Sequence, residues 1–203
     1  MVSSDDDRIG AFAAMHGALY HKRSEESCRD DAPIVEAVIE ALQQTSYEVD
    51  TDCVLVLYPV APFATVDDIT EGMAVLERQR CNVVYPVYKA REHVERVLIR
   101  RGDRVLPRYP EYTETNSQYF ETTYHSAGQW YLADIAWLLA NRTLTPLEAG
   151  FVEIPQRRAV DIDTPDDWLI AEMLYVNEHL PGVGKEMTAK VAAAIWEDCD
   201  DGK

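Results

Sequence analysis

Two aspartates separated by one residue, Asp161 and Asp163, are the first candidates for chemistry in this sequence. They fall in an expected strand over residues 158–163, where side chains two apart point to the same face. Neighbouring carboxylates repel unless a cation lies between them, and Mg²⁺ shared with substrate phosphates is the natural occupant. The alternative is a strand end whose aspartates cap the next helix and face water. On the motif alone this alternative is favoured, because D-x-D is short and common.

A second polar cluster covers residues 124–131, with the sequence YHSAGQWY. His125 and Gln129 offer hydrogen bonds beside an Ala-Gly pair that permits close approach of the backbone. This combination suits recognition of a polyhydroxylated ligand. The alternative, favoured without further context, is a polar loop that runs into an aromatic strand.

The remaining charged candidates are one set of arginines and one run of aspartates. Arg23, Arg157 and Arg158 carry forked guanidinium groups that match carboxylates and phosphates, although surface ion pairs are their commoner use. The aspartates at 5–7 fit a helix N-terminus better than a metal site. The sequence has no nucleophile elbow, Walker loop or GxGxxG motif.

Composition describes a globular and strongly acidic protein. The 203 residues are 47% hydrophobic, with 36 acidic against 19 basic side chains and a net charge of −17. Bulk attraction to nucleic acid or to an anionic membrane is therefore excluded as the basis of binding. The four cysteines form no CxxC pair, no apolar run reaches membrane-spanning length, and the start has no signal-peptide pattern. These features predict reduced thiols and a cytoplasmic location.

Alternating strand and helix patterns predict the elements that hold these residues. A continuous apolar run at 53–57 is typical of a strand buried on both faces, as in a parallel sheet. The order favours an α/β layered fold with a mainly parallel sheet. We expect helices at 6–16, 31–43, 67–79, 134–141 and 164–178; strands at 53–57, 82–88, 127–133, 149–154 and 158–163; a hairpin at 94–105 turning near Gly102; and a long loop at 107–126.

Taken in order, these segments resemble the cytidylyltransferases that activate nine-carbon sugar acids. VSSDDDRIGAFAAMHGA is similar to the family's V-S-T-D-D segment and following helix, and VLVLYPVAPF to its strand ending in A-T-A-P-F. KRSEESCRDDA resembles R-P-x-E-L-x-x-D, with Ser24 in place of Pro and Ser27 in place of Leu. VDIDTPDDW is close to V-D-I-D-T-x-x-D-W. TNSQYF and YHSAGQWY resemble R-S-Q-D-L and Y-H-D-A-G-Q-F-Y, which point to the pseudaminic acid branch.

The resemblance implies a Rossmann-like, GT-A-like nucleotidyltransferase fold over residues 1–177, with a helical extension at 178–203. It implies transfer of CMP from CTP to a nonulosonic (pseudaminic or sialic-like) acid, with release of pyrophosphate. Asp161 and Asp163 would be the catalytic, Mg²⁺-holding pair, and residues 91–120 the contact of a homodimer. By the same resemblance, the nucleotide would meet Arg23, Ala32 and Tyr58, and the sugar would meet Gln118, His125, Gln129 and Arg157. Asn116 and Ser126 depart from the family's Arg and Asp.

The family also opens with a strand and a Gly-, Arg- and Lys-rich loop that holds the triphosphate, and these 203 residues contain no such loop. We therefore expect the first βα unit to be missing from this chain and the chain alone to be weakly stable or inactive. A misplaced start codon, a fragmentary gene and a split protein whose partner supplies the loop are the three explanations. The alternative function is a non-catalytic subunit that binds nucleotide or sugar, or an inactive remnant.

Overall fold

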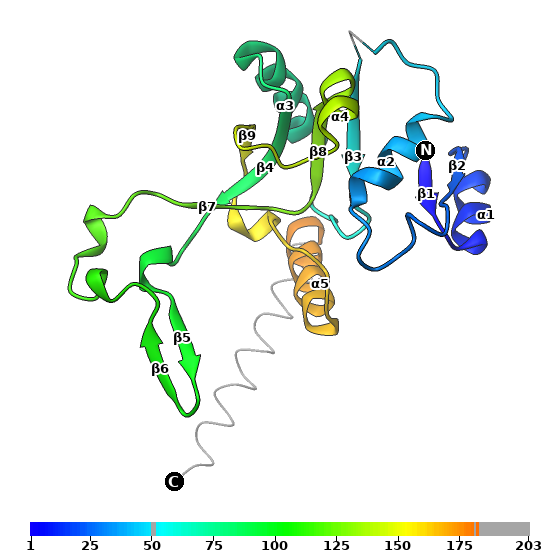
Figure 1. Cartoon of the computed structure of the whole chain (residues 1–203). Coiled ribbons are helices and arrows are strands. Elements are labelled where there is room, and N and C mark those ends of the chain that lie inside the picture. Colours follow the sequence, from blue (N-terminus) through cyan, green and yellow to red (C-terminus); the bar gives the residue numbers. More distant parts are fainter. Residues whose placement is uncertain (50–51, 181, 183–203) are drawn as a thin grey trace. The chain divides into compact units, whose positions relative to one another are not determined.

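The computed structural model describes residues 1–49, 52–180 and 182, and its Cα atoms group into two compact units. The first unit comprises Met1–Leu57, Thr65–Pro86 and Trp130–Val152. The second comprises Tyr58–Ala64, Val87–Gln129 and the described residues from Glu153 onward. Figure 1 labels the elements along the chain. Because the chain passes repeatedly from one unit to the other, each unit is assembled from segments far apart in sequence.

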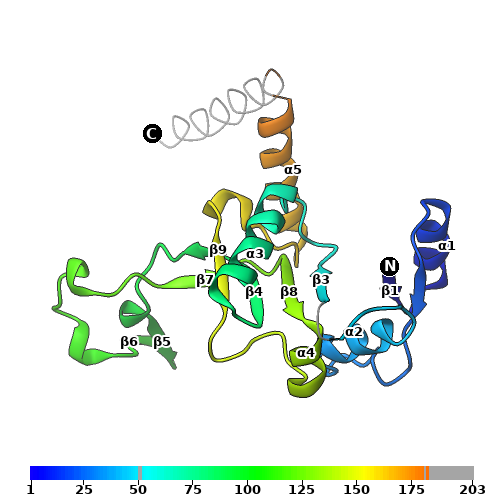
Figure 2. The same cartoon turned by 90° about the horizontal axis from the view of Figure 1, so that it is seen from above.

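The first unit opens with a small βαβ motif. β1 (Val2–Ser4) and β2 (Tyr20–Lys22) pair in parallel, and α1 (Asp7–Met15) packs beside them (Figure 2). Asp6 caps α1 by accepting from the Arg8 amide, as the placement of residues 5–7 at a helix N-terminus predicted. α1 buries Gly10 against the Tyr20 ring, which leaves Phe12 65% exposed.

The second helix connects two parts of the first unit. α2 (Ile34–Leu42) begins after Pro33 and buries four apolar side chains, and Glu36 on its first turn pairs with Arg142. Arg142 is the C-cap of α4 (Ile135–Asn141). The ion pair therefore ties the start of α2 to the end of α4, although the two residues are 106 positions apart in sequence. The buried side chains of α2 are those of Val35, Ala37, Ile39 and Leu42.

The core sheet of the first unit is antiparallel in its described pairs. β8 (Trp130–Asp134) pairs antiparallel with β3 (Cys53–Leu57) and with the start of β4 (Val83–Lys89). The expectation of a mainly parallel sheet is therefore wrong for these pairs. The strands β3 and β4, joined by α3 (Val66–Gln79), do run in the same direction. They are not neighbours, because β8 lies between them and runs against both.

Tight packing fixes β8 against α3. The Trp130 side chain is fully buried, and a Cβ at Gly72 of α3 would lie 2.7 Å from its ring. Gly150, at the start of β9 (Gly150–Glu153), makes a similarly close approach to Val84 and Cys81. By contrast, β3 is not buried on both faces as expected, since Leu55 and Leu57 are exposed. In the described pairing β3 has β8 as its one partner and lies at the edge of the sheet.

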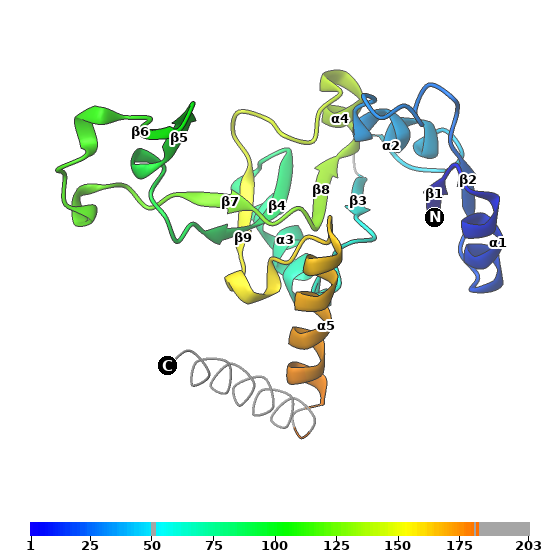
Figure 3. The same cartoon turned by 90° about the horizontal axis from the view of Figure 1, so that it is seen from below.

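The second unit carries a hairpin arm and the last helix. β5 (Leu98–Arg101) and β6 (Arg104–Pro107) form the expected hairpin, turning at Gly102 with a φ of +62° (Figure 3). The short 3₁₀ segments η1 (Val94–Arg96), η2 (Pro110–Tyr112) and η3 (Ser117–Tyr119) flank it. β7 (Tyr124–Ser126) then pairs antiparallel with Val87–Lys89 at the end of β4. The expected long loop at 107–126 is thus a series of turns that leads into a strand.

The expected strand at 158–163 is not formed. η4 (Gln156–Arg158) uses the amides of Arg158 and Ala159 in local turns, and the amides of Asp163 and Thr164 donate to the Asp167 carboxylate. These donors are therefore not available for a ladder with another strand. α5 (Pro165–His179) follows, with Thr164 as its cap, as expected. Of the predicted helical extension at 178–203, the structure describes residues 178–180 and 182, where α5 continues to His179, and the rest lies outside the described residues.

Within the described ranges, every helix is too short or too polar to cross a lipid bilayer. 

Candidate active site

The residues predicted to act on substrate fall into two groups, one in each unit. Arg23 and Ala32 belong to the first unit. The second unit holds the rest, which are Tyr58, Gln118, His125, Gln129, Arg157, Asp161 and Asp163.

The acidic pair lies in the irregular segment that precedes α5. Asp161 and Asp163 are both exposed, with Ile162 half-buried between them, so the alternation expected of a strand persists without the strand. Partial burial raises the pKa of Asp161, and the charges of Asp163 and Asp167 raise it further. Asp167 is occupied elsewhere, because its carboxylate closes the capping box of α5. Asp161 and Asp163 are therefore the two carboxylates of this segment with room for a cation.

Gly128 lies against Asp161, one member of the acidic pair. Its φ is +65°, and a Cβ placed on it would lie 3.0 Å from Oδ2 of Asp161. The Gly128 amide donates to the Ser126 hydroxyl, which holds this turn of the chain between β7 and β8. The Ala-Gly pair singled out from the sequence thus permits a close backbone approach, to a carboxylate of the chain itself.

Gln129 joins three segments of the second unit. Its side chain is 1% exposed, and Nε2 donates to the backbone carbonyl of Arg158. Its own carbonyl accepts the Tyr58 amide at 2.9 Å. Oε1 is buried and has no hydrogen-bond partner in the described part of the chain. Gln129 therefore holds η4 and the segment after β3 in place, and it retains one buried acceptor that a water can satisfy.

The other predicted sugar-site residues are more exposed. His125 lies on β7 with its ring 5.5 Å from that of Tyr88, measured between centroids. Gln118 lies in η3 and Arg157 in η4, and both side chains are exposed. No hydrogen bond among the described residues links Gln118, His125 and Arg157 to one another. Hydrogen bonds link Gln129 directly to Tyr58 and to the Arg158 backbone, whereas Gln118, His125 and Arg157 are not linked to one another in this way.

Arg23 in the first unit has one anchored nitrogen. Nε donates to the Ser3 hydroxyl at 3.1 Å, and the Arg23 amide donates to the Ser4 carbonyl. Its terminal nitrogens have no hydrogen bond or ion pair within the described residues, although the protein carries 36 acidic side chains. Ala32 follows on the turn before α2, where its amide donates to the Arg29 carbonyl. Arg23 is therefore a half-buried cation whose terminal nitrogens are left for an anionic or polar ligand.

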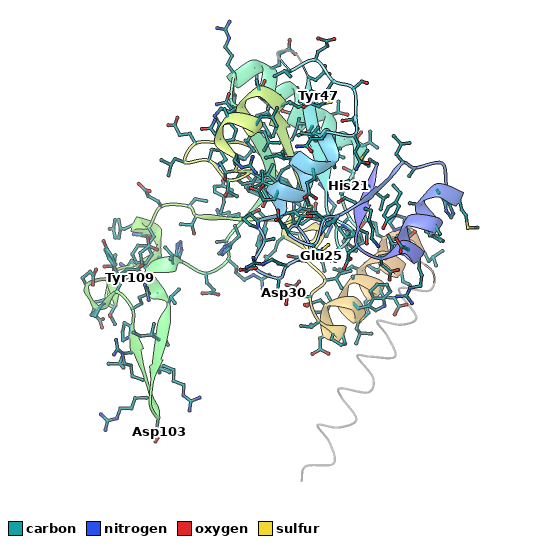
Figure 4. All side chains as sticks on the ribbon, turned by 45° about the vertical axis from the view of Figure 1, so that its right-hand side comes forward. His21, Glu25, Asp30, Tyr47, Asp103 and Tyr109 are labelled. Atoms are coloured by element: carbon teal, nitrogen blue, oxygen red, sulfur yellow. The ribbon has the colours of Figure 1, made fainter. Side chains whose placement is uncertain are left out.

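Sequence reasoning missed the residues that support Arg23. Ser3 contacts the buried His21, which lies on β2 (Figure 4), and His21 faces Glu40 of α2. Glu40 accepts hydrogen bonds from both Ser24 and Ser27. The one signal available was that these two serines depart from the family's Pro and Leu. Nothing in the sequence pointed to Glu40 as their common partner.

A divalent cation fits the acidic pair by its chemistry. Within the described ranges, no cluster of three or more His, Cys, Asp or Glu side chains is arranged as a metal site. Mg²⁺ needs no such cage, because it commonly uses one or two protein carboxylates and takes its other ligands from water and substrate phosphates. Partial burial raises the pKa of Asp161 most, and the charges of Asp163 and Asp167 add to the shift; a bound cation would offset both effects.

Comparison with known proteins identifies two relatives by sequence and one solved structure with a similar fold. No protein-family model matches the chain. Two pseudaminic acid cytidylyltransferases of Campylobacter jejuni subsp. jejuni, from serotypes O:2 and O:23/36, are each 25% identical over 185 residues, covering 88% of this chain and 78% of the relative. The structure of CMP:2-keto-3-deoxy-manno-octonic acid synthetase complexed with CTP is similar with a TM-score of 0.56 and 13% identity, covering 87% of this chain and 80% of that one. At this identity the likeness establishes the fold.

Proposed function

We propose that this chain is a sugar-acid cytidylyltransferase that transfers CMP from CTP to a nonulosonic acid of the pseudaminic type. The anomeric hydroxyl of the sugar attacks the α-phosphate, and pyrophosphate leaves. The proposal is supported by the two pseudaminic acid cytidylyltransferase relatives and by the shared fold. The cytoplasm is the proposed location, in keeping with the free thiols of Cys28, Cys53 and Cys81.

The Asp161–Asp163 pair is the observation that carries this proposal. Both carboxylates are exposed, two residues apart and uncompensated by any described cation, and Asp161 has a raised pKa. They would hold Mg²⁺, which supplies neutralisation of the triphosphate charge and of the departing pyrophosphate. Gly128 supports the arrangement because its missing side chain leaves room for the Asp161 carboxylate.

Arg23, Ala32 and Tyr58 are proposed to bind the nucleotide. The terminal nitrogens of Arg23 lack a described partner, and its Nε is fixed by Ser3, so a forked donor is presented in a defined orientation. The Tyr58 amide already donates a hydrogen bond to the Gln129 carbonyl, so Tyr58 would contact the nucleotide through its side chain. Relatives often carry Gln at this position, so the tyrosine gives this chain a different group toward the base.

Gln118, His125, Gln129 and Arg157 are proposed to recognise the sugar acid. Arg157 is exposed and has no described carboxylate partner, which leaves its guanidinium for the substrate carboxylate. The buried Oε1 of Gln129 accepts a hydrogen bond from a sugar hydroxyl or from a bridging water. These groups offer both charge and directed hydrogen bonds, as a polyhydroxylated acid requires.

A homodimer through residues 91–120 is part of the same proposal. Residues 94–108 contain five arginines and two acidic residues, a local charge of +3 (5 − 2) in a chain of net charge −17. Figure 4 labels Asp103 at the tip of the hairpin. The arm also exposes Val97, Leu98, Val105 and Leu106. A basic arm with exposed apolar side chains is complementary to the acidic surface of a second copy, and sedimentation at rising salt concentration tests this contact.

Turnover assays decide between the enzyme and a binding subunit. The purified chain is given CTP, Mg²⁺ and pseudaminic or sialic acid, and pyrophosphate release is followed together with formation of the CMP-sugar. Product that forms with wild type and is lost in Asp161→Asn supports the transferase. Saturable binding of CTP or sugar acid without product, seen by calorimetry, would instead establish a non-catalytic binding subunit. Absence of both binding and product contradicts the proposal.

A further inference from the structure

A nearly inaccessible histidine lies beneath Arg23 in the first unit. The His21 side chain is 2% exposed, and its Nδ1 is 3.0 Å from the Ser3 hydroxyl on the paired strand β1. Its Nε2 lies 3.9 Å from Oε2 of Glu40. A buried polar ring needs partners for its nitrogens, and Ser3 and Glu40 stand on its two sides.

The Ser3 hydroxyl links Arg23 to His21. Its Nε is always a donor, so the Ser3 oxygen must accept from Arg23. The Ser3 hydroxyl also lies 3.0 Å from Nδ1 of His21, and either atom can donate there because a hydroxyl oxygen has two lone pairs. Nε2 of His21 faces the Glu40 carboxylate at 3.9 Å. A continuous line of contacts thus leads from Arg23 through Ser3 and His21 to Glu40.

Glu40 also holds the backbone that follows Arg23. Its Oε1 accepts from the Ser24 hydroxyl at 2.5 Å, and its Oε2 accepts from the Ser27 hydroxyl at 2.7 Å and from the Ser24 amide at 3.3 Å. These are the two positions at which this chain replaces the family's Pro and Leu. The two departures are therefore linked, because both serines bond the same carboxylate.

We propose that Ser3, His21, Ser24, Ser27 and Glu40 form a positioning network that presents Arg23 to the bound nucleotide. Ser3 fixes the Nε end of the guanidinium, while Glu40 fixes the chain on either side through His21 and the two serines. The terminal nitrogens of Arg23 are thereby aimed before the ligand arrives, so its side chain loses little freedom on binding. In this chain the polar network takes the place of the rigid Pro and apolar Leu of the family pattern. The inference rests on the proposed function only for the identity of the ligand.

Ser3→Ala and Glu40→Gln are the test variants, and each has a matched control. Ser3→Thr keeps the hydroxyl on a strand residue. Glu36→Gln removes a carboxylate from the same helix, where it pairs with Arg142 and not with the network. We expect the Kd and KM for CTP to rise about tenfold in Ser3→Ala and Glu40→Gln, with kcat changed little and both controls close to wild type. These increases should vanish in an Arg23→Ala background, whereas independent structural damage would add to the Arg23→Ala loss.

A ligand-free measurement separates this proposal from the proposed function. The Nε–H signal of Arg23, assigned by its absence in Arg23→Lys, should be sharp and protected from solvent exchange in wild type. It should lose that protection in Ser3→Ala while it is kept in Ser3→Thr. If wild type neither binds nor turns over CTP, the proposed function fails while this measurement still tests the network. Unchanged protection in Ser3→Ala, or purely additive effects in the Arg23→Ala background, would overturn the positioning role.

Discussion

Gly128 and Asp161 are packed so closely that the space for a Cβ on Gly128 lies 3.0 Å from a carboxylate oxygen of Asp161. The glycine also has a φ of +65°, a conformation that other residues adopt at a cost of about 1–2 kcal/mol. Two separate physical reasons thus require glycine at this position. One concerns the backbone of Gly128 itself, and the other concerns the placement of a proposed metal ligand.

Gly128→Ala should therefore lose more than stability. We expect a drop of about 1 kcal/mol in the free energy of unfolding from the left-handed backbone, and in addition a weaker dependence of turnover on Mg²⁺ because Asp161 is displaced. Gly102→Ala is the control, since Gly102 has a φ of +62° and nothing within 4 Å of its added Cβ. Urea unfolding and a Mg²⁺ titration of both variants separate strain from contact. Equal Mg²⁺ dependence in the two would argue against the role of the Gly128–Asp161 contact.

Asp161→Asn should stabilise the metal-free protein and abolish turnover. The pKa of Asp161 is raised by burial and by two neighbouring carboxylates, so its charged form is disfavoured in the folded state. The penalty is fully present above the raised pKa and disappears as the pH falls below the ordinary carboxyl range. We therefore expect a higher melting temperature for the variant at pH 7 without Mg²⁺, and a difference from wild type that shrinks on acidification.

Asp166→Asn is the matched control for this comparison. Asp166 lies in the first turn of α5, where a negative charge is favourable, so its removal should lower stability slightly. Melting curves of both variants at pH 7, with and without Mg²⁺, give the comparison. A lower melting temperature for metal-free Asp161→Asn would mean that the carboxylate is satisfied by the protein and does not await a cation.

Gln129→Leu should destabilise the second unit by about 1–3 kcal/mol, because it removes a buried hydrogen bond to the Arg158 backbone. Loss of the η4 anchor should also raise the KM for the sugar acid through Arg157. Gln118→Leu, at an exposed position in η3, should change stability by no more than about 0.5 kcal/mol. The free energies of unfolding of the two variants are measured by urea denaturation, with m-values that match the wild type. Similar stability losses in the two variants would be inconsistent with an anchoring role for Gln129.

Glu40 should make stability sensitive to acid. Hydrogen bonds from Ser24 and Ser27 lower its pKa, with a further contribution from His21. A carboxyl group with a lowered pKa contributes stability above its unfolded pKa, and this contribution is lost as the pH falls through the folded value. The advantage of wild type over Glu40→Gln in the free energy of unfolding should thus be full near neutral pH and vanish in acid. An advantage that does not change with pH would mean that the charge of Glu40 contributes nothing.

Local patterns in the sequence determined most of the elements. The apolar run at 53–57 and the helical spacing at 67–79 correspond to β3 and α3. The turn at Gly102 and the Thr164–Pro165 start of α5 are likewise confirmed, because caps and turns depend on neighbouring residues. The resemblance to the cytidylyltransferases was also visible in the sequence, and two relatives at 25% identity support it.

Pairing between distant segments was decided only by the tertiary structure. No local signal places β8 between β3 and β4, so the order of helices and strands suggested a parallel sheet where the described pairs are antiparallel. The exposure of Leu57 follows from the same arrangement, because strand burial depends on neighbours and not on composition.

The candidate site was likewise predicted in part from the sequence and decided in part by the tertiary structure. Asp161, Gln129 and Arg23 were identified as candidates from the sequence, because the chemistry of a carboxylate, an amide or a guanidinium group is known from the residue type. The residues that contact them were not identified, because Gly128 lies against Asp161, and Glu40 contacts Ser24 and His21, only in the folded chain. Sequence by itself therefore determined which polar and charged groups are candidates for binding the nucleotide and the sugar acid of the proposed reaction. Tertiary contacts between residues far apart along the chain decided how those groups are held, because hydrogen bonds and close packing act over ångströms in space and leave no local pattern.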